Sequence, residues 1–158
     1  MFSVISNSTN DTIKLGKKLA SFLKKGDIVV LSGDLGAGKT KFVSGFLSFF
    51  DKEAEVSSPT FTIVNEYNLP NNLNLFHFDV YRLKSQEEFL NTGGDELFDK
   101  GISIIEWGEL IEDILPDNFL KIVIEKVPDN IDIRKFSFSS NNPKFGKNFE
   151  EAFLKWRY

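Results

Sequence analysis

The chain of 158 residues contains no cysteine, a single histidine and only three arginines. Without cysteine it forms no disulfide bond, has no thiol nucleophile and binds no metal through thiolates. The single His77 excludes metal centres that need several histidines. No apolar run approaches the roughly 18 residues of a membrane-spanning helix, and the first twelve residues lack the features of a signal peptide. We therefore expect a cytoplasmic protein with no membrane partner.

The charged residues are unevenly distributed, although the net charge is only −4. Residues 1–50 carry a net charge of +4, residues 51–133 carry −12 and residues 134–158 carry +4. A nucleic-acid backbone binds clustered cations, so the acidic middle disfavours direct, independent binding of nucleic acid. The basic segment that begins at Arg134 matches no known motif, and the sequence gives it no role.

A glycine-rich loop is the most informative stretch of the chain. It follows four consecutive apolar residues, 28–31, which predict a buried strand, and it precedes apolar residues at helical spacing over 42–50. The loop matches G-x-x-x-x-G-K-[ST], in which backbone N–H groups and the lysine bind phosphates and the hydroxyl binds Mg²⁺. We therefore expect a nucleoside triphosphate with Mg²⁺ to bind at Gly33, Asp34, Leu35, Gly36, Ala37, Gly38, Lys39 and Thr40.

Strands and helices alternate around this loop. Further strands are predicted at residues 2–5, 61–69, 72–83, 101–107, 119–127 and 131–140, and helices within 7–27, at the start of 85–98 and at 149–158. This order predicts an α/β fold, the three-layer fold of P-loop NTPases, with a mixed, largely parallel central sheet and an antiparallel C-terminal portion. Length and composition predict a single domain, residues 1–158.

Two acidic residues end apolar runs in the predicted strands. Asp79 ends FHFD and Glu106 ends SIIE. Because the carboxyl ends of such strands face the phosphate loop, both are candidates for the catalytic site. Glu106 follows its apolar run in the manner of a Walker B acid, so we expect it to bind Mg²⁺ together with Thr40, and Asp79 to position water or sense the γ-phosphate. The sequence leaves open which acid contacts the metal directly.

Three residues near these acids give weaker signals. Thr60 lies in SSPTFTIVNEY, residues 57–67, which has the features of a switch segment whose hydroxyls meet the γ-phosphate or Mg²⁺. Trp107 follows Glu106 and is a candidate to stack on the nucleotide base or to pack against a partner, while packing in the core is an equal alternative. His77 is interpreted as a buried structural histidine rather than a catalyst.

Four segments together resemble the TsaE (YjeE) family of small bacterial P-loop ATPases. They are GDLGAGKT, SSPTFTIVNEY, FHFDVYRL and ISIIEW, in this order and spacing, and the resemblance covers about residues 8–126. It implies that the nucleotide is ATP and that the partners are TsaB and TsaD. That pair transfers a threonylcarbamoyl group to adenosine 37 of tRNA, so the resemblance implies contact with tRNA only indirectly, through the complex.

The resemblance also implies roles for individual residues. Lys39 and Thr40 would bind phosphate and Mg²⁺, Thr60 and Asp79 would lie in the first and second switches, and Glu106 would lie at the metal. Trp107 matches a tryptophan that the family has beside this acid. The chain departs from the family pattern after the loop, where members often have a threonine and an arginine in place of Lys41 and Ser44.

The expected function is therefore that of an ATPase that supports repeated cycles of the TsaB–TsaD pair. A small-molecule kinase is one alternative, but the chain has few arginines and no segment that resembles an arginine-bearing lid. A nucleotide-responsive binding module with negligible hydrolysis is the other alternative. The scarcity of arginine predicts slow hydrolysis by the isolated protein, with partners completing the site.

Overall fold

The computed structural model describes residues 1–57 and 63–155 of the chain. In these residues seven strands form one sheet, in the order β1-β7-β6-β2-β5-β4-β3. The strands are β1 (Phe2–Ser6), β2 (Ile28–Ser32), β3 (Val64–Leu69), β4 (Leu73–Asp79), β5 (Ile102–Glu106), β6 (Leu120–Val127) and β7 (Asn130–Ser140). The α-helices are α1 (Thr9–Ala20), α2 (Lys39–Ser48), α3 (Gln86–Asn91) and α4 (Lys147–Leu154), and the 3₁₀ helices are η1 (Gly94–Leu97), η2 (Gly108–Ile114) and η3 (Pro143–Phe145).

The centre of the sheet is parallel and its edges are antiparallel. Strands β6, β2, β5 and β4 pair in parallel, whereas β3 forms a hairpin with β4, and β7 pairs antiparallel with both β6 and β1. The prediction of an α/β fold with a mixed central sheet and an antiparallel C-terminal portion is confirmed. The parallel pairing brings the carboxyl ends of β2, β4 and β5 to one edge, which is where ligands bind in such sheets.

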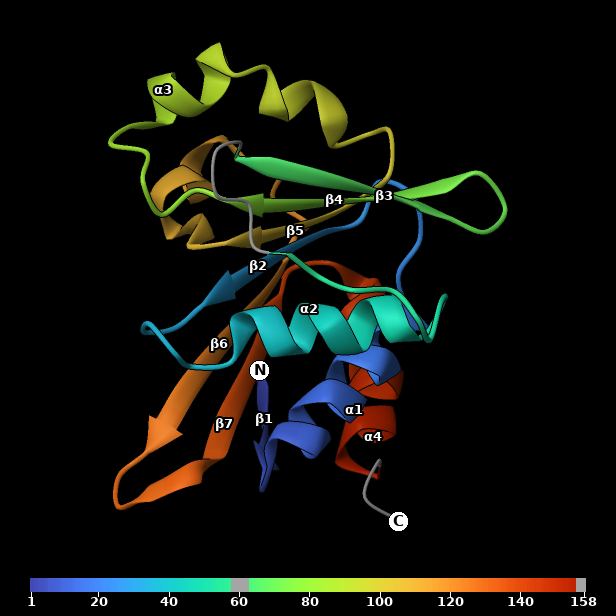
Figure 1. Cartoon of the computed structure of the whole chain (residues 1–158), viewed down its shortest axis with the longest axis vertical. Coiled ribbons are helices and arrows are strands. Elements are labelled where there is room, and N and C mark those ends of the chain that lie inside the picture. The colour runs from blue at the N-terminus through green and yellow to red at the C-terminus, as the bar shows by residue number, and fades with distance from the viewer. Residues whose placement is uncertain (58–62, 156–158) are drawn as a thin grey trace.

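Helices cover both faces of the sheet (Figure 1). Val29 and Leu31 of β2 belong to an apolar cluster that includes residues of α1, α2 and α4. Ile28 and Val30 point the other way, into a second cluster that includes Phe89 of α3. Because both faces are buried, β2 is apolar at four consecutive positions, which is the pattern that the sequence shows.

Strand β4 ends four residues earlier than the predicted strand 72–83. The Val80 N–H donates to the carbonyl oxygen of Glu106 (3.2 Å), and the Tyr81 N–H donates to Oδ1 of Asp79 (3.0 Å). The carboxylate therefore closes a tight turn directly after the strand, and the apolar and aromatic residues that follow leave the sheet. The prediction that this strand continues to residue 83 is therefore wrong.

Helices α1 and α2 touch through their backbones at two glycines. A Cβ atom at Gly16 would lie 2.0 Å from the carbonyl oxygen of Phe42, and a Cβ atom at Gly45 would lie 1.9 Å from the carbonyl oxygen of Ile13. Real Cβ contacts are never so short, so any other residue at either position would force the two helices apart. This close packing fixes the position of α2, whose first turn follows the glycine loop.

We expect Gly45→Ala to lower the melting temperature by about 5–10 °C. Overpacking costs up to about 3 kcal/mol, and each kcal/mol shifts the melting temperature by about 2–4 °C in a chain of this length. Thermal unfolding followed by circular dichroism measures the change. Lys17→Ala is the control, because Lys17 is exposed on α1 and its replacement should shift the melting temperature by less than about 2 °C. Equal melting temperatures for the two variants would contradict the packing argument.

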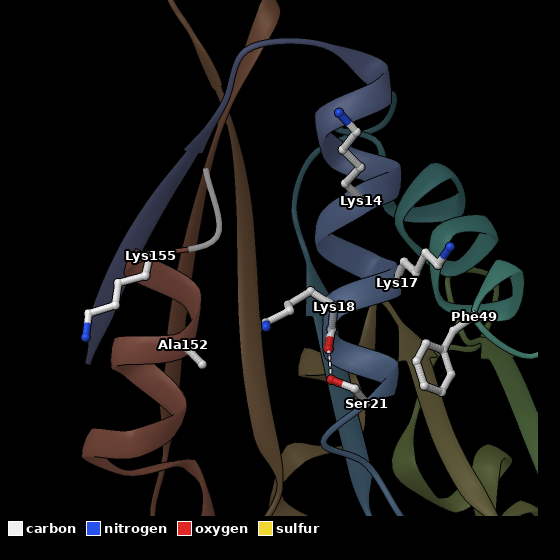
Figure 2. A pocket seen from close by; sticks show the side chains of 7 residues that line it. All are labelled: Lys14, Lys17, Lys18, Ser21, Phe49, Ala152 and Lys155. Atoms are coloured by element: carbon white, nitrogen blue, oxygen red, sulfur yellow. Dashed lines mark hydrogen bonds between the residues drawn. The ribbon is translucent and has the colours of Figure 1, made fainter. Parts of the chain in front are cut away.

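The two basic ends of the chain meet on the face formed by α1 and α4. A shallow hollow of about 570 Å³ lies there, at the opposite end of α2 from the glycine loop. Figure 2 shows the side chains that line it, namely Lys14, Lys17, Lys18, Ser21, Phe49, Ala152 and Lys155. Within the described ranges, no helix is long and apolar enough to cross a membrane.

Candidate functional site

The glycine loop joins β2 to α2 and leaves the first turn of α2 open. Gly38 caps the helix with φ 107°, and Gly33 has φ 145°. A Cβ atom at Gly33 would lie 2.4 Å from the carbonyl oxygen of Ile124 in β6, so only glycine fits. The Phe42 N–H bonds to the carbonyl oxygen of Gly38 (3.0 Å), and N–H groups in the turn before it have no acceptor within the helix. These N–H groups and the positive end of the helix dipole favour an anion.

A hollow of about 340 Å³ opens over this loop. It is lined by Leu35, Gly36, Ala37, Gly38, Lys39, Thr40, Lys41, Asp79, Glu106 and Trp107. The structure thus brings together most of the loop, both strand-end acids and the tryptophan that the sequence proposed as parts of one site. Gly33 and Asp34 do not line the hollow, but their carbonyl oxygens accept hydrogen bonds from the Lys39 side chain. The roles of all these residues toward a nucleotide stay predictions.

The side chain of Lys39 is folded back onto its own loop and is almost fully buried, with 6% exposed. Its Nζ donates to the carbonyl oxygens of Gly33 (2.5 Å) and Asp34 (3.1 Å) and lies 4.0 Å from the centroid of the Trp107 ring. Burial lowers the pKa of Lys39, and the negative charge of Glu106 opposes that shift. The ammonium would gain stronger, charge-assisted hydrogen bonds by exchanging these carbonyls for phosphate oxygens.

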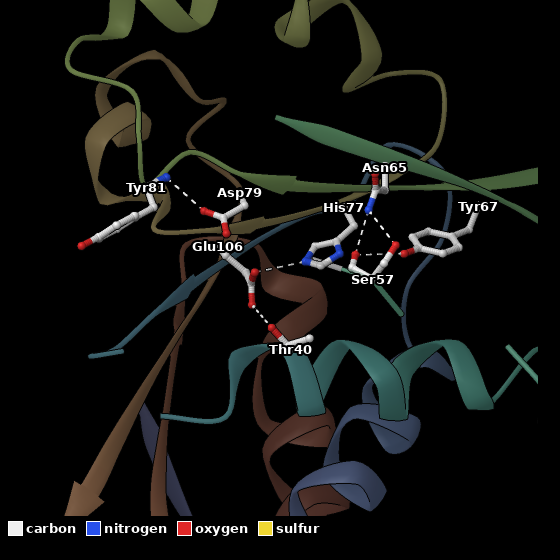
Figure 3. A network of polar contacts seen from close by, with 8 residues as sticks. All are labelled: Thr40, Ser57, Asn65, Tyr67, His77, Asp79, Tyr81 and Glu106. Atoms are coloured by element: carbon white, nitrogen blue, oxygen red, sulfur yellow. Dashed lines mark hydrogen bonds and ion pairs between the residues drawn. The ribbon is translucent and has the colours of Figure 1, made fainter. Parts of the chain in front are cut away.

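A chain of polar contacts runs from α2 into the sheet (Figure 3). Oγ1 of Thr40 donates to Oε1 of Glu106 at 3.2 Å, and Oε2 of Glu106 lies 3.3 Å from Nε2 of His77. Glu106 is 2% exposed and His77 is completely buried. The carboxylate of Glu106 is therefore held between the first turn of α2 and the middle of β4.

Asp79 lies beside Glu106, as its register partner across β4 and β5. Burial raises the pKa of the Asp79 carboxyl and the charge of Glu106 raises it further, while the hydrogen bond from the Tyr81 N–H acts against these effects. A half-buried carboxyl group with a raised pKa, beside an anion-binding loop, has the properties of a group that orients a water molecule and accepts its proton.

We expect Asp79→Asn to raise the melting temperature at pH 7, with a gain that shrinks as the pH falls. Because the pKa of Asp79 is raised in the folded state, folding is weakened when this carboxyl is charged. That loss disappears as the pH falls through the raised folded-state pKa toward the ordinary value of 3.8. Melting temperatures of both proteins between about pH 4 and 7 measure the difference. A gain that is constant over this range would show that the charge of Asp79 is not its cause.

Trp107 has a left-handed backbone conformation, with φ 60°, which is rare for so large a side chain. Its backbone N–H donates to the carbonyl oxygen of Leu31 (3.0 Å). The centroid of its ring lies 4.8 Å from the centroid of the Tyr81 ring. The ring also lies under the Lys39 ammonium and packs against the second apolar cluster. Backbone strain of this kind gathers at functional sites, where the surrounding structure maintains it, and here it turns the ring over the hollow.

Two cations from the β6–β7 hairpin also reach the loop, and the sequence analysis missed both. Nζ of Lys126 donates to the carbonyl oxygen of Leu35 (2.7 Å), and Nε of Arg134 donates to that of Ala37 (3.0 Å). These residues follow from the topology, because β6 lies directly beside β2 and its end therefore reaches the loop after β2. Arg134, to which the sequence gave no role, helps to fix the conformation of the glycine loop.

The predicted switch segment, residues 57–67, is only partly covered. Thr60 lies outside the described residues, so its predicted role stays a prediction. The start of the segment is held to β3, because Nδ2 of Asn65 donates to the carbonyl oxygen of Ser57 (2.8 Å). Figure 3 shows this contact beside His77, which is the register partner of Asn65 across β3 and β4.

The residues of the hollow fit Mg²⁺ that arrives with phosphates. In the part of the chain that the structure describes, no group of three or more His, Asp or Glu side chains could hold a metal by itself. Mg²⁺ sites commonly use one or two carboxylates together with substrate phosphates. A buried carboxylate, Glu106, already bonded to the hydroxyl of Thr40 at an anion-binding loop, supplies such a donor set.

A family model described as "Threonylcarbamoyl adenosine biosynthesis protein TsaE" matches residues 6–135, a range that contains every candidate site residue. The chain belongs to the TsaE family. The resemblance carried by the four sequence segments is therefore confirmed. The family is one of tRNA threonylcarbamoyladenosine biosynthesis, as the names of its curated members also say.

Similar TsaE proteins match over most of their own length. The tRNA threonylcarbamoyladenosine biosynthesis protein TsaE of Bacillus subtilis is 42% identical over 142 residues, which are 89% of this chain and 87% of that protein. The TsaE of Haemophilus influenzae is 36% identical over 147 residues, or 89% and 90% of the two chains. The crystal structure of Bacillus subtilis YdiB matches with a TM-score of 0.77 and 33% identity, covering 99% of this chain and 96% of that one.

Proposed function

We propose that this TsaE protein binds ATP with Mg²⁺ and hydrolyses it slowly, and that hydrolysis supports repeated cycles of a TsaB–TsaD pair in the modification of tRNA. The observation that carries the proposal is the arrangement at the glycine loop. Lys39 and Thr40 begin α2 and Glu106 ends β5, so two distant parts of the chain converge at the edge where the carboxyl ends of the parallel strands meet. The names of the TsaE relatives support the pathway.

Each of these groups has a distinct task. The N–H groups of the loop and of the first turn of α2 bind phosphate oxygens, and Lys39 neutralises their charge. Thr40 and Glu106 would hold Mg²⁺, which when bound polarises the phosphoryl group and lowers the charge that the protein must neutralise. Asp79, next to Glu106, orients the attacking water and accepts its proton.

Slow hydrolysis by the isolated protein is expected from the position of Arg134, an arginine that reaches the glycine loop. Enzymes of this class accelerate phosphoryl transfer with an arginine that contacts the transferred phosphate. The guanidinium of Arg134 is instead engaged with the backbone, because it donates to the carbonyl oxygens of Ala37, Ile131 and Ile133. A partner protein that completes the site would therefore increase the rate of hydrolysis. In this proposal the TsaB–TsaD pair is that partner.

Phosphate release, complex formation and tRNA modification test the proposal together. Phosphate release from ATP and GTP is measured for the isolated protein and after addition of TsaB and TsaD, and pull-downs with these two proteins are made with and without ATP. We expect slow ATP hydrolysis alone, a changed rate with the partners, and multiple rounds of tRNA modification only when ATP is hydrolysed. Fast hydrolysis that ignores both partners would contradict the proposal, and a phosphorylated nucleoside in place of free phosphate would identify a kinase.

A further inference from the structure

His77 is buried without the hydrogen bonds that usually compensate for the burial of a histidine side chain. Its side chain is completely inaccessible, yet within the described residues neither ring nitrogen has an aligned hydrogen-bond partner. The carboxylate of Glu106 lies nearby, with Oε2 3.3 Å from Nε2. Buried polar groups normally have hydrogen-bond partners, so an unsatisfied ring on a buried strand needs an explanation.

The packing of β4 does not call for a histidine at this position. Leu75 lies on the same face of the strand and belongs to the apolar cluster beneath α2, as does Ile104, the register partner of His77 on β5. An apolar side chain at position 77 would continue this pattern and would leave no polar group unpaired. The fold by itself therefore favours an apolar residue where the imidazole stands.

The position of His77 places its imidazole against one carboxylate oxygen of Glu106. The two residues are diagonal neighbours, because His77 pairs with Ile104 and Asp79 pairs with Glu106 across the parallel strands β4 and β5. Oε1 of Glu106 accepts the hydroxyl of Thr40, and Oε2 is the oxygen that faces His77. With a hydrogen on Nε2, the imidazole restricts rotation of the carboxylate from the side that α2 does not reach.

We propose that His77 is a positioning residue that holds the carboxylate of Glu106 in the orientation needed for the Mg²⁺ of a bound nucleotide. The inference rests on the proposed function, and it assigns to His77 a role beyond the structural one that the sequence suggested. The distance of 3.3 Å between Nε2 and Oε2 is within reach of a small rotation that would align the two groups. Groups that orient a metal ligand in this way change metal affinity or activity about 10- to 100-fold when they are removed.

A leucine at position 77 separates this role from a structural one. We expect His77→Leu to retain or raise the melting temperature of the nucleotide-free protein, since it removes an unpaired buried group. ATP affinity without Mg²⁺ should stay within about threefold, whereas the gain in affinity that Mg²⁺ provides and the rate of phosphate release should fall about tenfold or more. His77→Gln can place an amide N–H close to the position of Nε2 and should restore part of both losses.

Two further variants make the result specific. Ser103→Ala is the control, because Ser103 is also buried and unpaired but lies on β5 with its side chain on the face opposite Glu106, and it should leave Mg²⁺ dependence and hydrolysis unchanged. In a Glu106→Gln background, His77→Leu should cause no further loss, because a residue that acts through Glu106 has nothing left to position. An additional loss in that background would overturn the inference.

The remaining outcomes are equally decisive. If His77→Leu lowers the melting temperature strongly, or leaves both Mg²⁺ dependence and hydrolysis within twofold of wild type, His77 has no positioning role. The Mg²⁺ dependence of ATP affinity also separates this inference from the proposed function. If the wild-type protein binds ATP but releases no phosphate with or without partners, the ATPase proposal fails, and the affinity measurements still decide the role of His77.

Discussion

Replacing Lys39 by methionine is expected to weaken ATP binding about 100-fold. Removal of one partner of a buried charge pair costs about 2–5 kcal/mol, and a tenfold change in affinity corresponds to about 1.4 kcal/mol. Lys39 is the buried cation of the hollow, where the carboxylates of Asp79 and Glu106 would otherwise repel a triphosphate. Methionine retains much of the length and apolar contact of the lysine stem, so the loss isolates the charge. Calorimetric titration with ATP, with and without Mg²⁺, measures the change.

The matched control is Lys17→Met, which removes one positive charge from the exposed face of α1 and should leave ATP affinity within about twofold. Stability is a second control for Lys39→Met. Within the described residues, Nζ donates its hydrogen bonds to carbonyl oxygens of the loop, so we expect the melting temperature to change by less than about 3 °C. A folded Lys39→Met protein that binds ATP as tightly as wild type would show that the loop does not bind the triphosphate.

Local patterns explain why so much of the site could be predicted from the sequence. The loop motif depends on residues that are adjacent in the chain, and its glycines are required by positive φ angles and by the close approach of β6. Asp79 and Glu106 could be predicted because each follows an apolar run, and parallel strands end at the same edge. Their side-by-side position is a consequence of register, which the sequence could suggest but not establish.

Contacts between distant segments could not be predicted in the same way. Lys126 and Leu35 are 91 positions apart and Arg134 and Ala37 are 97 apart, and both pairs meet only because β6 inserts beside β2. The interpretation of His77 as an ordinary buried histidine had a similar limit. Its burial follows from the strand pattern. The lack of an aligned partner among the described residues, and the proximity of Glu106, depend on side-chain directions across two strands.

Glu106→Gln is expected to separate hydrolysis from binding. The amide has nearly the size of the carboxylate and can still accept the Thr40 hydroxyl, so the packing between α2 and β4 is preserved. It carries no negative charge, however, and is a poor ligand for Mg²⁺. We expect phosphate release to fall about 100-fold, within the range of about 10²–10³ seen when one preorganised electrostatic group is removed. ATP affinity measured without Mg²⁺ should remain within about threefold of wild type.

Single-turnover measurements with bound ATP test this prediction directly, because they report hydrolysis without the contribution of nucleotide exchange. Glu87→Gln, an exposed position in the first turn of α3, makes the same chemical change away from the hollow and should leave the rate unchanged. The comparison with Asp79→Asn decides the question that the sequence left open. If Glu106 is the acid that contacts the metal, raising the Mg²⁺ concentration should partly restore Glu106→Gln but not Asp79→Asn, and the reverse pattern would assign the metal to Asp79.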